Sequence, residues 1–206
     1  IVRKNKEVRW IESDGIKIEW NGEEAGLYFA MDITERKSTE EKILYLSYYD
    51  QLTGLYNRRF YEEELERLDT KKNLPLTIVM ADVNGLKLTN DAFGHNSGDK
   101  LLKVVADTMK EELRRDDILA RIGGDEFILL LPKTDKVSAQ LIVDRIKEKI
   151  AKKTVEKIKV SVSFGFDTKK EESEDIEKVF SQAEDYMYRR KLLESTSMKS
   201  EMITLI

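Results

Sequence analysis

The sequence lacks several features that would point to particular protein classes. It contains no cysteine, which excludes disulfides, thiolate metal sites and cysteine nucleophiles and fits a reducing compartment. It has no apolar run of membrane length and no signal peptide, so we expect a cytoplasmic chain; because it starts on Ile1, an upstream membrane anchor stays open. Its 36 basic and 40 acidic residues give a net charge of −4. We therefore expect no nucleic-acid partner, and local cations would have to hold any polyanionic ligand.

Residues 1–33 alternate between apolar and polar side chains. The pairs Asp14-Gly15 and Asn21-Gly22 interrupt the alternation and predict three short strands in an antiparallel β-meander. Three strands alone cannot bury both faces, so we interpret them as the end of a larger sheet domain. Residues 34–49 are highly charged and predict a linker helix with Thr34 as its N-cap.

From Asp50 onward the hydrophobic pattern switches repeatedly between helix and strand periods. Apolar residues at three- and four-residue spacing predict helices over residues 58–68, 97–114, 139–150 and 176–187. Apolar or alternating runs predict strands over residues 76–83, 118–123, 126–131 and 158–164. This order predicts an α/β (α+β) fold with a central mixed sheet flanked by helices, of the ferredoxin-like palm type.

The segment RIGGDEFILLL places two glycines and two acids before an apolar strand. A tight hairpin turn needs positive φ angles, which Gly123 and Gly124 supply without strain, so the turn alone explains the glycines. A turn does not need both Asp125 and Glu126, however. Glycines also let a phosphorylated ligand approach the backbone, and adjacent carboxylates attract a hard cation. A simple turn and a ligand site both remain open as interpretations.

A second acidic segment follows the strand that ends at Asp82. If this strand lies beside the hairpin, Asp82 and Asp125 converge, and two carboxylates together with substrate phosphates suit Mg²⁺. Lys87 supplies a cation close by in the sequence. The backbone N–H groups of the segment that begins at Gly85 and Leu86 can point at the same anion.

Two polar residues further along match the edge of a guanine base. The Asp99 carboxylate can accept two N–H hydrogens, and Asn90 can both donate and accept. Taken singly, Asn90 is also an ordinary turn residue, and Asp99 is ordinary at a helix start. The one histidine, His95, has no second His or Cys for a metal set, so we interpret it as a loop or capping residue.

Three motifs follow one another along the chain: DQLTGLYNRR (residues 50–59), DVNGLKLTNDAFGHNSGD (82–99) and GGDEF (123–127). Together they resemble the GGDEF family of diguanylate cyclases. The resemblance runs roughly from Asp50 to Lys191, within a cyclase domain that we place at residues 50–194, and it implies a nucleotidyl-cyclase palm. It also implies an enzyme that condenses two GTP molecules into cyclic di-GMP and two pyrophosphates across a homodimer, with Mg²⁺ or Mn²⁺ as cofactor.

The resemblance assigns roles to individual residues. It implies that Asp82, the Val83 carbonyl and Asp125 hold the metal. It makes Asp125, Glu126 and Lys87 catalytic. Because a metal-bound carboxylate is a poor base, we favour activation of the attacking hydroxyl by the metal over deprotonation by either acid. The substrate-binding residues that it implies are Asn90, Asp99, Leu102, Gly85, Leu86, Gly123, Gly124 and Lys191.

A further motif precedes GGDEF. Arg114 and Asp117 match the family's RxxD product-inhibition site, and we take Arg145 as a third contact. The resemblance implies that cyclic di-GMP binds there and inhibits, because guanidinium groups bind guanine edges and stack on bases. Without the resemblance, basic residues in the last turn of a helix, followed by acids, are ordinary.

The chain departs from the family pattern at several positions. Glu194 and Ser195 stand where the family has glycine and then arginine, and Asn84 and Leu86 stand where it usually has Asp and Phe. The loss of a phosphate-binding arginine favours a rival function, a noncatalytic GTP- or cyclic di-GMP-binding module that controls an adjacent domain. A cyclase that makes a different cyclic dinucleotide is a third alternative, since base selection depends on two residues.

The two ends of the chain are interpreted separately. Residues 1–33, which lead into DITERK, resemble the closing strands of a truncated PAS sensor domain. Residues 195–206 are interpreted as a tail that leads into a further domain. The tyrosines of the linker are interpreted as packing residues rather than as platforms for a base: Tyr45, Tyr48 and Tyr49.

Overall fold

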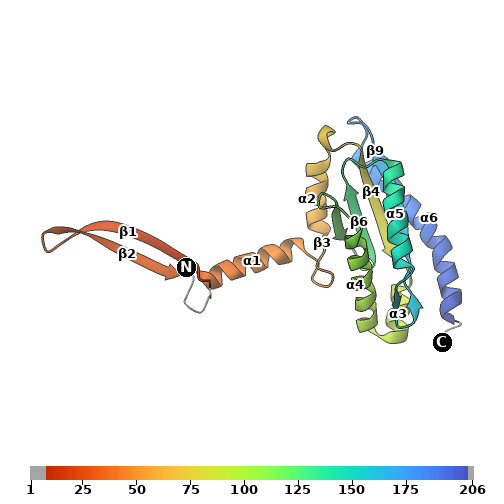
Figure 1. The fold of residues 1–206 in the computed structure, drawn as a ribbon, viewed down its shortest axis with the longest axis horizontal. Helices are drawn as coiled ribbons and strands as arrows, with labels where there is room; N and C mark the ends of the chain where they lie inside the picture. The colour runs from red at the N-terminus through yellow and green to blue at the C-terminus, as the bar shows by residue number, and fades with distance from the viewer. Residues whose placement is uncertain (1–7, 204–206) are drawn as a thin grey trace. The chain divides into compact units, whose positions relative to one another are not determined.

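The computed structural model describes the backbone of residues 8–203 and the side chains of residues 8–194 (Figure 1). The chain forms two compact units, Ile1–Ser47 and Tyr48–Ile206. The first contains the antiparallel strands β1 (Ile11–Trp20) and β2 (Glu23–Asp32), followed by helix α1 (Thr34–Tyr48). Within residues 8–203, no helix is both long and apolar enough to span a bilayer.

The N-terminal strands form a two-stranded hairpin rather than the expected three-stranded meander. The turn at Asn21-Gly22 is confirmed, and both residues adopt positive φ angles of 54° and 82°. The turn expected at Asp14-Gly15 is wrong, because both residues lie inside β1. Gly15 is paired with Tyr28, whose ring occupies the space that a Cβ at residue 15 would need, so this glycine accommodates an aromatic side chain. The first expected strand begins at Glu7, which lies outside the described residues.

The expected N-cap at Thr34 is also wrong. Thr34 is already the first helical residue of α1, and its hydroxyl accepts the N–H of Trp10 (2.9 Å). The Asp32 carboxylate accepts the N–H of Thr34 (3.0 Å). Asp32 therefore satisfies one of the N–H groups that have no partner inside the helix.

The second unit is built on a five-stranded sheet in the order β3-β5-β6-β4-β9. Its strands are β3 (Tyr56–Asn57), β4 (Leu76–Val83), β5 (Ile118–Arg121), β6 (Glu126–Leu131) and β9 (Val162–Lys169). Its helices are α2 (Arg58–Leu68), α3 (Leu86–Phe93), α4 (His95–Glu111), α5 (Lys136–Ile150) and α6 (Ile176–Ile203), with a 3₁₀ turn at Lys71–Asn73. β3 is parallel to β5 and the other neighbours are antiparallel, so the predicted mixed sheet flanked by helices is confirmed.

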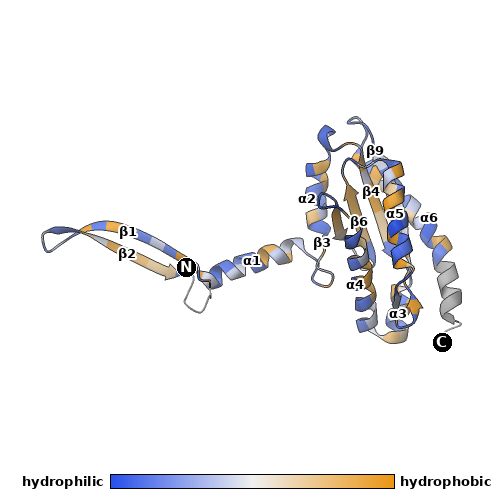
Figure 2. Cartoon of the chain, in the orientation of Figure 1, coloured by the Kyte–Doolittle hydropathy of each residue, from blue (hydrophilic) through white to orange (hydrophobic). Residues whose placement is uncertain are grey.

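Helices cover both faces of this sheet, so its central strands are apolar over most of their length (Figure 2). Along β4, Val79 and Ala81 belong to the core beneath α4 and α5. Ile78 and Met80 belong to the opposite core, with α2 and α6. Because side chains alternate between the faces of a strand, the next residue in the second series, Asp82, projects to the α6 face.

The strand expected over residues 158–164 is two strands in the structure. β8 (Ile158–Lys159) pairs with β7 (Thr154–Val155) around a turn in which Glu156 and Lys157 have positive φ angles. The strand of the main sheet, β9, begins only at Val162. The alternating pattern is therefore shared between two sheets, and the prediction of one half-buried strand is wrong.

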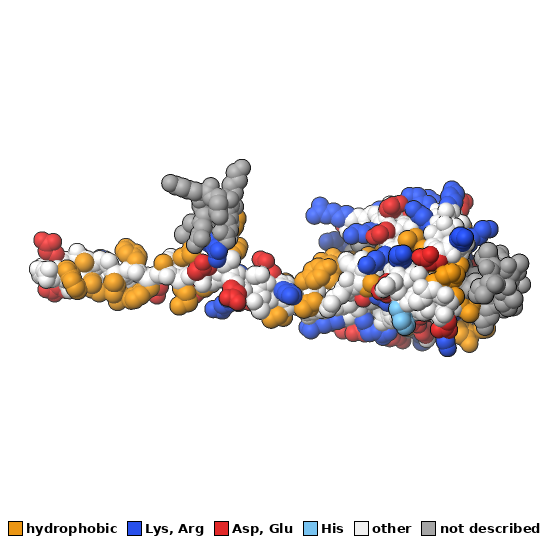
Figure 3. All heavy atoms as spheres, turned by 90° about the horizontal axis from the view of Figure 1, so that it is seen from below, with side chains coloured by type: hydrophobic (Ala, Val, Ile, Leu, Met, Phe, Trp, Pro, Cys, Tyr) orange, Lys and Arg blue, Asp and Glu red, His pale blue; other side chains and the backbone are white. Residues whose placement is uncertain are grey.

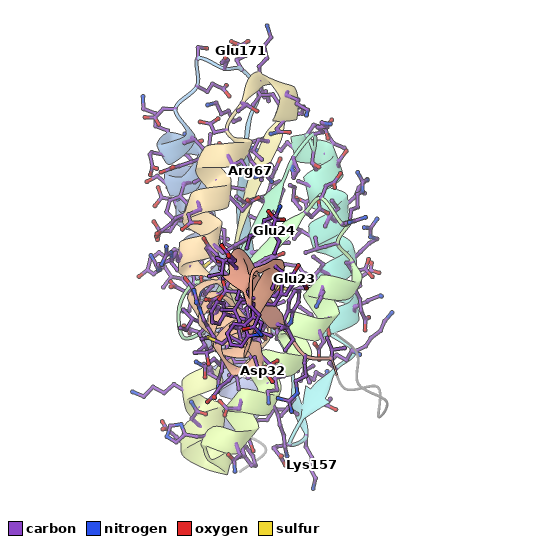
Figure 4. The ribbon with its side chains drawn as sticks, turned by 90° about the vertical axis from the view of Figure 1, so that its left-hand side faces the viewer. Glu23, Glu24, Asp32, Arg67, Lys157 and Glu171 are labelled. Carbon is purple, nitrogen blue, oxygen red and sulfur yellow. The ribbon has the colours of Figure 1, made fainter. Side chains whose placement is uncertain are left out.

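β9 is buried on both faces, which its alternating sequence did not suggest. Phe164 packs into the core on the α5 side. On the other side, the α6 backbone at Met187 occupies the space that a Cβ at Gly165 would need. The glycine thus lets α6 lie directly on the strand. Lys157, before β9, and Glu171, in the loop after it, lie at opposite ends of this unit (Figure 4).

Candidate active site

Three polar side chains stand in one row across the sheet, near the end of β4. Asp82 is paired in register with Glu126 on β6 and with Ser163 on β9. Residues directly opposite each other in neighbouring strands project to the same face, which here is the α6 face. The sheet therefore brings Asp82 beside the GGDEF hairpin, as expected from the sequence.

Asp82 and Asp125 share one cation. Nζ of Lys191, on α6, lies 2.6 Å from Oδ2 of Asp82 and 3.7 Å from Oδ2 of Asp125. Asp82 is only 2% exposed. Burial raises the pKa of Asp82 to about 6, the charge of Asp125 adds to the rise, and the hydrogen bond from Lys191 opposes it.

This set of oxygen atoms fits a divalent metal. Oδ1 of Asp82 is buried and has no hydrogen-bond partner in the chain, and buried polar atoms normally have one. Mg²⁺ is commonly held by one or two carboxylates together with substrate phosphates and water. Among the residues described, no group of three or more His, Cys, Asp or Glu could hold a metal. A metal at Asp82 and Asp125 would thus need further ligands from a nucleotide, water or a backbone carbonyl such as that of Val83.

The two glycines of GGDEF do not adopt the expected conformation. Neither Gly123 nor Gly124 has a positive φ angle, so the geometric reason predicted for them is wrong. A Cβ at Gly123 would meet the end of the Glu126 side chain, which is flexible and can move away. At Gly124 a Cβ would meet nothing within 4 Å. The chain itself therefore gives no steric reason for a glycine at residue 124, and its missing side chain leaves room for a ligand.

Two arginines anchor this turn. Arg121 donates to the Gly124 carbonyl (2.7 Å) and to both carboxylate oxygens of Asp50 (3.1 and 3.2 Å). Arg58 donates to the Ile122 carbonyl (3.0 Å). Sequence reasoning missed these contacts because they depend on the parallel pairing of β3 with β5, which no periodicity revealed.

Asp50 is held firmly in its turn. Its Oδ1 accepts the backbone N–H (2.9 Å) and the hydroxyl (2.6 Å) of Thr53. Burial raises the pKa of Asp50, but the hydrogen bonds from Thr53 and Arg121 outweigh burial and leave that pKa below its usual value. The first motif of the chain thus supports the GGDEF turn through Arg121.

The residues expected to read a base lie on α3 and α4. Gly85 precedes α3 with a φ of 75°, a conformation that favours glycine. Oδ1 of Asn90 is buried without a hydrogen-bond partner and lies where a Cβ at Gly98 would be. Asp99 is exposed on the first turns of α4, whereas Leu102 is buried in the core. The structure thus offers a buried acceptor at Asn90 for a ligand donor.

The remaining expected residues near the site differ in their surroundings. Lys87 is exposed in the first turn of α3, and Leu86 is partly buried against the core beneath α4. His95 is the exposed first residue of α4. Lys191, expected to bind phosphate, contacts the two carboxylates.

A cavity whose lining includes neither Asp82 nor Asp125 lies elsewhere in this unit. It measures about 370 Å³, and Arg114 and Asp117 line it together with Tyr49 and Tyr56. Asp117 accepts the backbone N–H of Arg114 (2.8 Å), and burial raises the pKa of Asp117. Arg145 does not line this cavity, because its Nε donates to Glu112 (3.0 Å). The tyrosines of the linker end pack as expected, Tyr49 on Tyr56 (5.0 Å) and Tyr48 on Phe60 (5.6 Å).

Two departures from the family pattern meet at Ser163. Asn84, which is buried, donates to the hydroxyls of Ser161 and Ser163 (3.0 Å each). The Ser163 hydroxyl also donates to Glu194, which accepts in addition from Lys147 (3.3 Å). The acid at residue 194 therefore has a hydrogen-bond donor and a cation of its own. The side chain of Ser195 lies outside the described residues.

Comparison with known proteins shows the family of the chain. Residues 47–196 match the family described as "Diguanylate cyclase, GGDEF domain". Over 189 residues the chain is 32% identical to diguanylate cyclase DgcM of Escherichia coli K12, an alignment that covers 89% of this chain and 45% of that protein. The chain thus spans about half the length of this relative.

Solved structures show the same fold. Diguanylate cyclase SiaD of Pseudomonas aeruginosa, in complex with its activator SiaC, is similar at 30% identity with a TM-score of 0.64, covering 77% of this chain and 65% of that one. The coiled coil and GGDEF domain of DgcB from Caulobacter crescentus, in complex with c-di-GMP, has a TM-score of 0.68 at 22% identity, covering 76% and 86%. From its motifs, its mixed sheet and these matches, the chain belongs to the GGDEF family of diguanylate cyclases.

Proposed function

We propose that this chain condenses two GTP molecules into cyclic di-GMP and two pyrophosphates. The observation that carries the proposal is the meeting of Asp82 and Asp125 on one ammonium group, with an unpartnered oxygen on the buried Asp82. Gly124 leaves space beside them. Such a site suits a cation and a triphosphate, because both carry charge that a carboxylate pair and nearby lysines can balance.

In this proposal, the carboxylates of Asp82 and Asp125 and the carbonyl of Val83 hold Mg²⁺. When bound, Mg²⁺ neutralises phosphate charge and lowers the pKa of the attacking hydroxyl. The acids of the site attract the ion, and Lys87 and Lys191 contact phosphate oxygens. Catalysis by the chain itself is mostly positioning and charge stabilisation, as is usual for phosphoryl transfer.

Asn90 and Asp99 orient the base. The buried Oδ1 of Asn90 accepts one N–H of guanine and thereby gains the partner that it lacks in the chain. The exposed carboxylate of Asp99 accepts the remaining N–H groups of the Watson–Crick edge. Leu102, Leu86 and the backbone at Gly85 complete the nucleotide site.

The reaction requires two copies of this site. In each half-reaction a ribose 3′-oxygen forms a bond to the α-phosphorus of the other GTP. The bond from that phosphorus to pyrophosphate breaks, pyrophosphate keeps its electron pair, and the hydroxyl proton passes to water. Each chain holds one nucleotide, so an antiparallel homodimer brings the two together. The product, cyclic di-GMP, inhibits by binding at Arg114 and Asp117, whose cavity of about 370 Å³ supports this assignment. Arg145 joins only if it leaves Glu112.

The N-terminal unit is proposed to be the end of a PAS sensor domain, joined by the linker helix at residues 34–49 to a cyclase domain at residues 50–194. Large apolar side chains gather along the hairpin (Figure 3). One face of it carries the exposed side chains of Ile16, Trp20, Leu27, Phe29 and Met31. An apolar face of this kind is expected when strands belong to a larger sheet. GTP as substrate and the absence of cysteine fit a cytoplasmic cyclase domain.

One observation favours a noncatalytic regulatory module instead. Glu194 adds an acid where the family has no charge, close to the carboxylates through Ser163. Because Lys147 and Ser163 satisfy this acid, it adds little free negative charge, and we prefer the enzyme.

Incubation of the purified chain with GTP and Mg²⁺, followed by chromatography of the products, tests the proposal. We expect cyclic di-GMP from the wild type and none from Asp125→Ala, with Asp107→Ala, an exposed acid on α4, as a matched control outside both sites. Retention of GTP without product would support the regulatory module, and a different cyclic dinucleotide would overturn the base assignment.

A further inference from the structure

The ammonium group of Lys191 contacts both carboxylates that a bridging metal would use. Its Nζ lies 2.6 Å from Oδ2 of Asp82 and within 4 Å of Oδ2 of Asp125. Mg²⁺ binds carboxylate oxygens at about 2.0–2.1 Å. Two cations on one carboxylate repel each other at such distances. Oδ1 of Asp82 has no partner, but an ion that bridges Asp82 and Asp125 competes with the ammonium, which contacts Oδ2 of both.

The helix that carries Lys191 cannot easily move to relieve this competition. One turn earlier, at Met187, the backbone of α6 lies against β9 where Gly165 has no side chain. About one turn after Lys191, Glu194 accepts hydrogen bonds from Ser163 and Lys147. The helix is thus attached to the sheet on both sides of residue 191.

The side chain of Lys191, by contrast, can move on its own. It is 34% exposed, whereas that of Asp82 is 3% exposed. A lysine has four flexible carbons and three donors that suit many acceptors. When a triphosphate is bound nearby, its oxygens offer the ammonium a new partner, and Asp82 becomes free for a metal.

We infer that Lys191 is a tethered counter-ion of the Asp82–Asp125 pair that a divalent cation must displace, so that the metal and the nucleotide bind together. This inference rests on the proposed function. Without nucleotide, Lys191 balances the buried carboxylate and keeps metal affinity low. With nucleotide, the ammonium moves to phosphate and the affinity for metal rises. Lys191 therefore couples the two binding events, beyond serving as a phosphate ligand.

Binding of Mn²⁺, measured by the loss of the free-ion signal in electron paramagnetic resonance, tests this inference without any turnover. In the absence of nucleotide, we expect Lys191→Met to bind Mn²⁺ about tenfold more tightly than the wild type, because the competing charge is gone. Lys191→Gln, which keeps a donor but no charge, should also bind Mn²⁺ more tightly than the wild type. It replaces the Met variant if that variant is unstable. Lys191→Arg keeps the charge and should keep the weak binding.

Lys100→Met is the matched control. It removes another lysine that pairs with an acid, Glu156 (3.3 Å), and changes the net charge equally. It should leave Mn²⁺ affinity at the wild-type value. If it tightens binding as much as Lys191→Met does, the effect is one of overall charge and the inference is overturned.

A second titration with a non-hydrolysable GTP analogue separates this inference from the proposed function. We expect the analogue to tighten Mn²⁺ binding in the wild type and to do so less in Lys191→Met. If the wild type binds Mn²⁺ with the analogue but neither neutral variant binds the ion more tightly without it, the counter-ion role is wrong while the metal site stands. If no variant binds Mn²⁺ with the analogue, both proposals fail.

Discussion

Removal of the Arg121 side chain should both free the GGDEF turn from its contact with residue 121 and lower the stability of the domain. Arg121 joins the Gly124 carbonyl to the Asp50 carboxylate through bonds of 2.7, 3.1 and 3.2 Å. The side chain of Arg121 is 13% exposed and that of Asp50 is 23% exposed. The pair therefore lies between a surface ion pair, which contributes about 0–1 kcal/mol, and a buried pair, whose disruption costs about 3–5 kcal/mol.

These limits set the expected magnitudes. Arg121→Met loses every one of these bonds and leaves a half-buried carboxylate without its cation, so the free energy of unfolding should fall by about 2–3 kcal/mol. Asp50→Asn keeps an acceptor for the Thr53 N–H but loses the charge, so it should cost about 1–2 kcal/mol. The loss of unfolding free energy in the double variant should be about 1–2 kcal/mol smaller than the sum of the two single losses, because each single change already breaks the pair.

Urea unfolding of the four proteins measures this coupling, and the rate of cyclic di-GMP synthesis reports on the turn. We expect both single variants to lose rate, and Arg121→Met to lose more, since only Arg121 contacts Gly124. Losses of stability that add within about 0.5 kcal/mol would show that the two residues act independently. The structural account of the turn would then be wrong.

Three further predictions concern single residues. Because the pKa of Asp50 lies below its usual value of 3.8, its contribution to stability is present above about pH 4 and lost as pH falls through the folded-state pKa; the stability difference between wild type and Asp50→Asn in urea should therefore shrink below pH 4, and a constant difference contradicts this. Gly98→Ala should displace Asn90 and raise KM for GTP about tenfold while the fold keeps or gains stability, since alanine favours helices by about 1 kcal/mol; an unchanged KM argues against Asn90 as a base contact. Glu194→Ala should destabilise the domain by about 1–2 kcal/mol, because it removes the acceptor of Ser163 and the partner of Lys147; urea unfolding at the wild-type midpoint would show that this network contributes nothing.

The elements with long regular patterns could be predicted from the sequence. The helix over residues 58–68 and the strand over residues 76–83 match α2 and β4 residue for residue. Each pattern is typical of one arrangement, since α2 buries a single face and β4 is a mostly apolar run that is buried throughout. The order of these elements then implied the mixed sheet.

Short elements and glycines could not be predicted in the same way. The two-residue strand β3 carries no period of its own and exists because β5 lies beside it. Glycine at residue 15 indicated a turn, but its cause is the ring of Tyr28 on the neighbouring strand. In each case the reason for the residue is a tertiary contact, which a local pattern does not contain.

The acidic residues of the candidate site could be predicted from the sequence, but the contacts between its side chains could not. Asp82 stood out because it ends a buried strand, and Asp125 because it follows two glycines. The contact of Lys191 with both acids depends on how α6 crosses the sheet at Gly165. The link from Glu194 to Asn84 through Ser163 depends on the same crossing. No spacing in the sequence encodes the angle of a helix on a sheet.

The most direct test of the central claim is the Mg²⁺ dependence of cyclic di-GMP synthesis in Asp82→Asn, Asp125→Asn and the double variant. If both carboxylates serve one ion, each single change should lower the rate at low Mg²⁺ by about 100-fold or more, and the double variant should be scarcely worse than either. A single variant that keeps the wild-type Mg²⁺ dependence, or losses that multiply in the double variant, would contradict a shared metal site at Asp82 and Asp125.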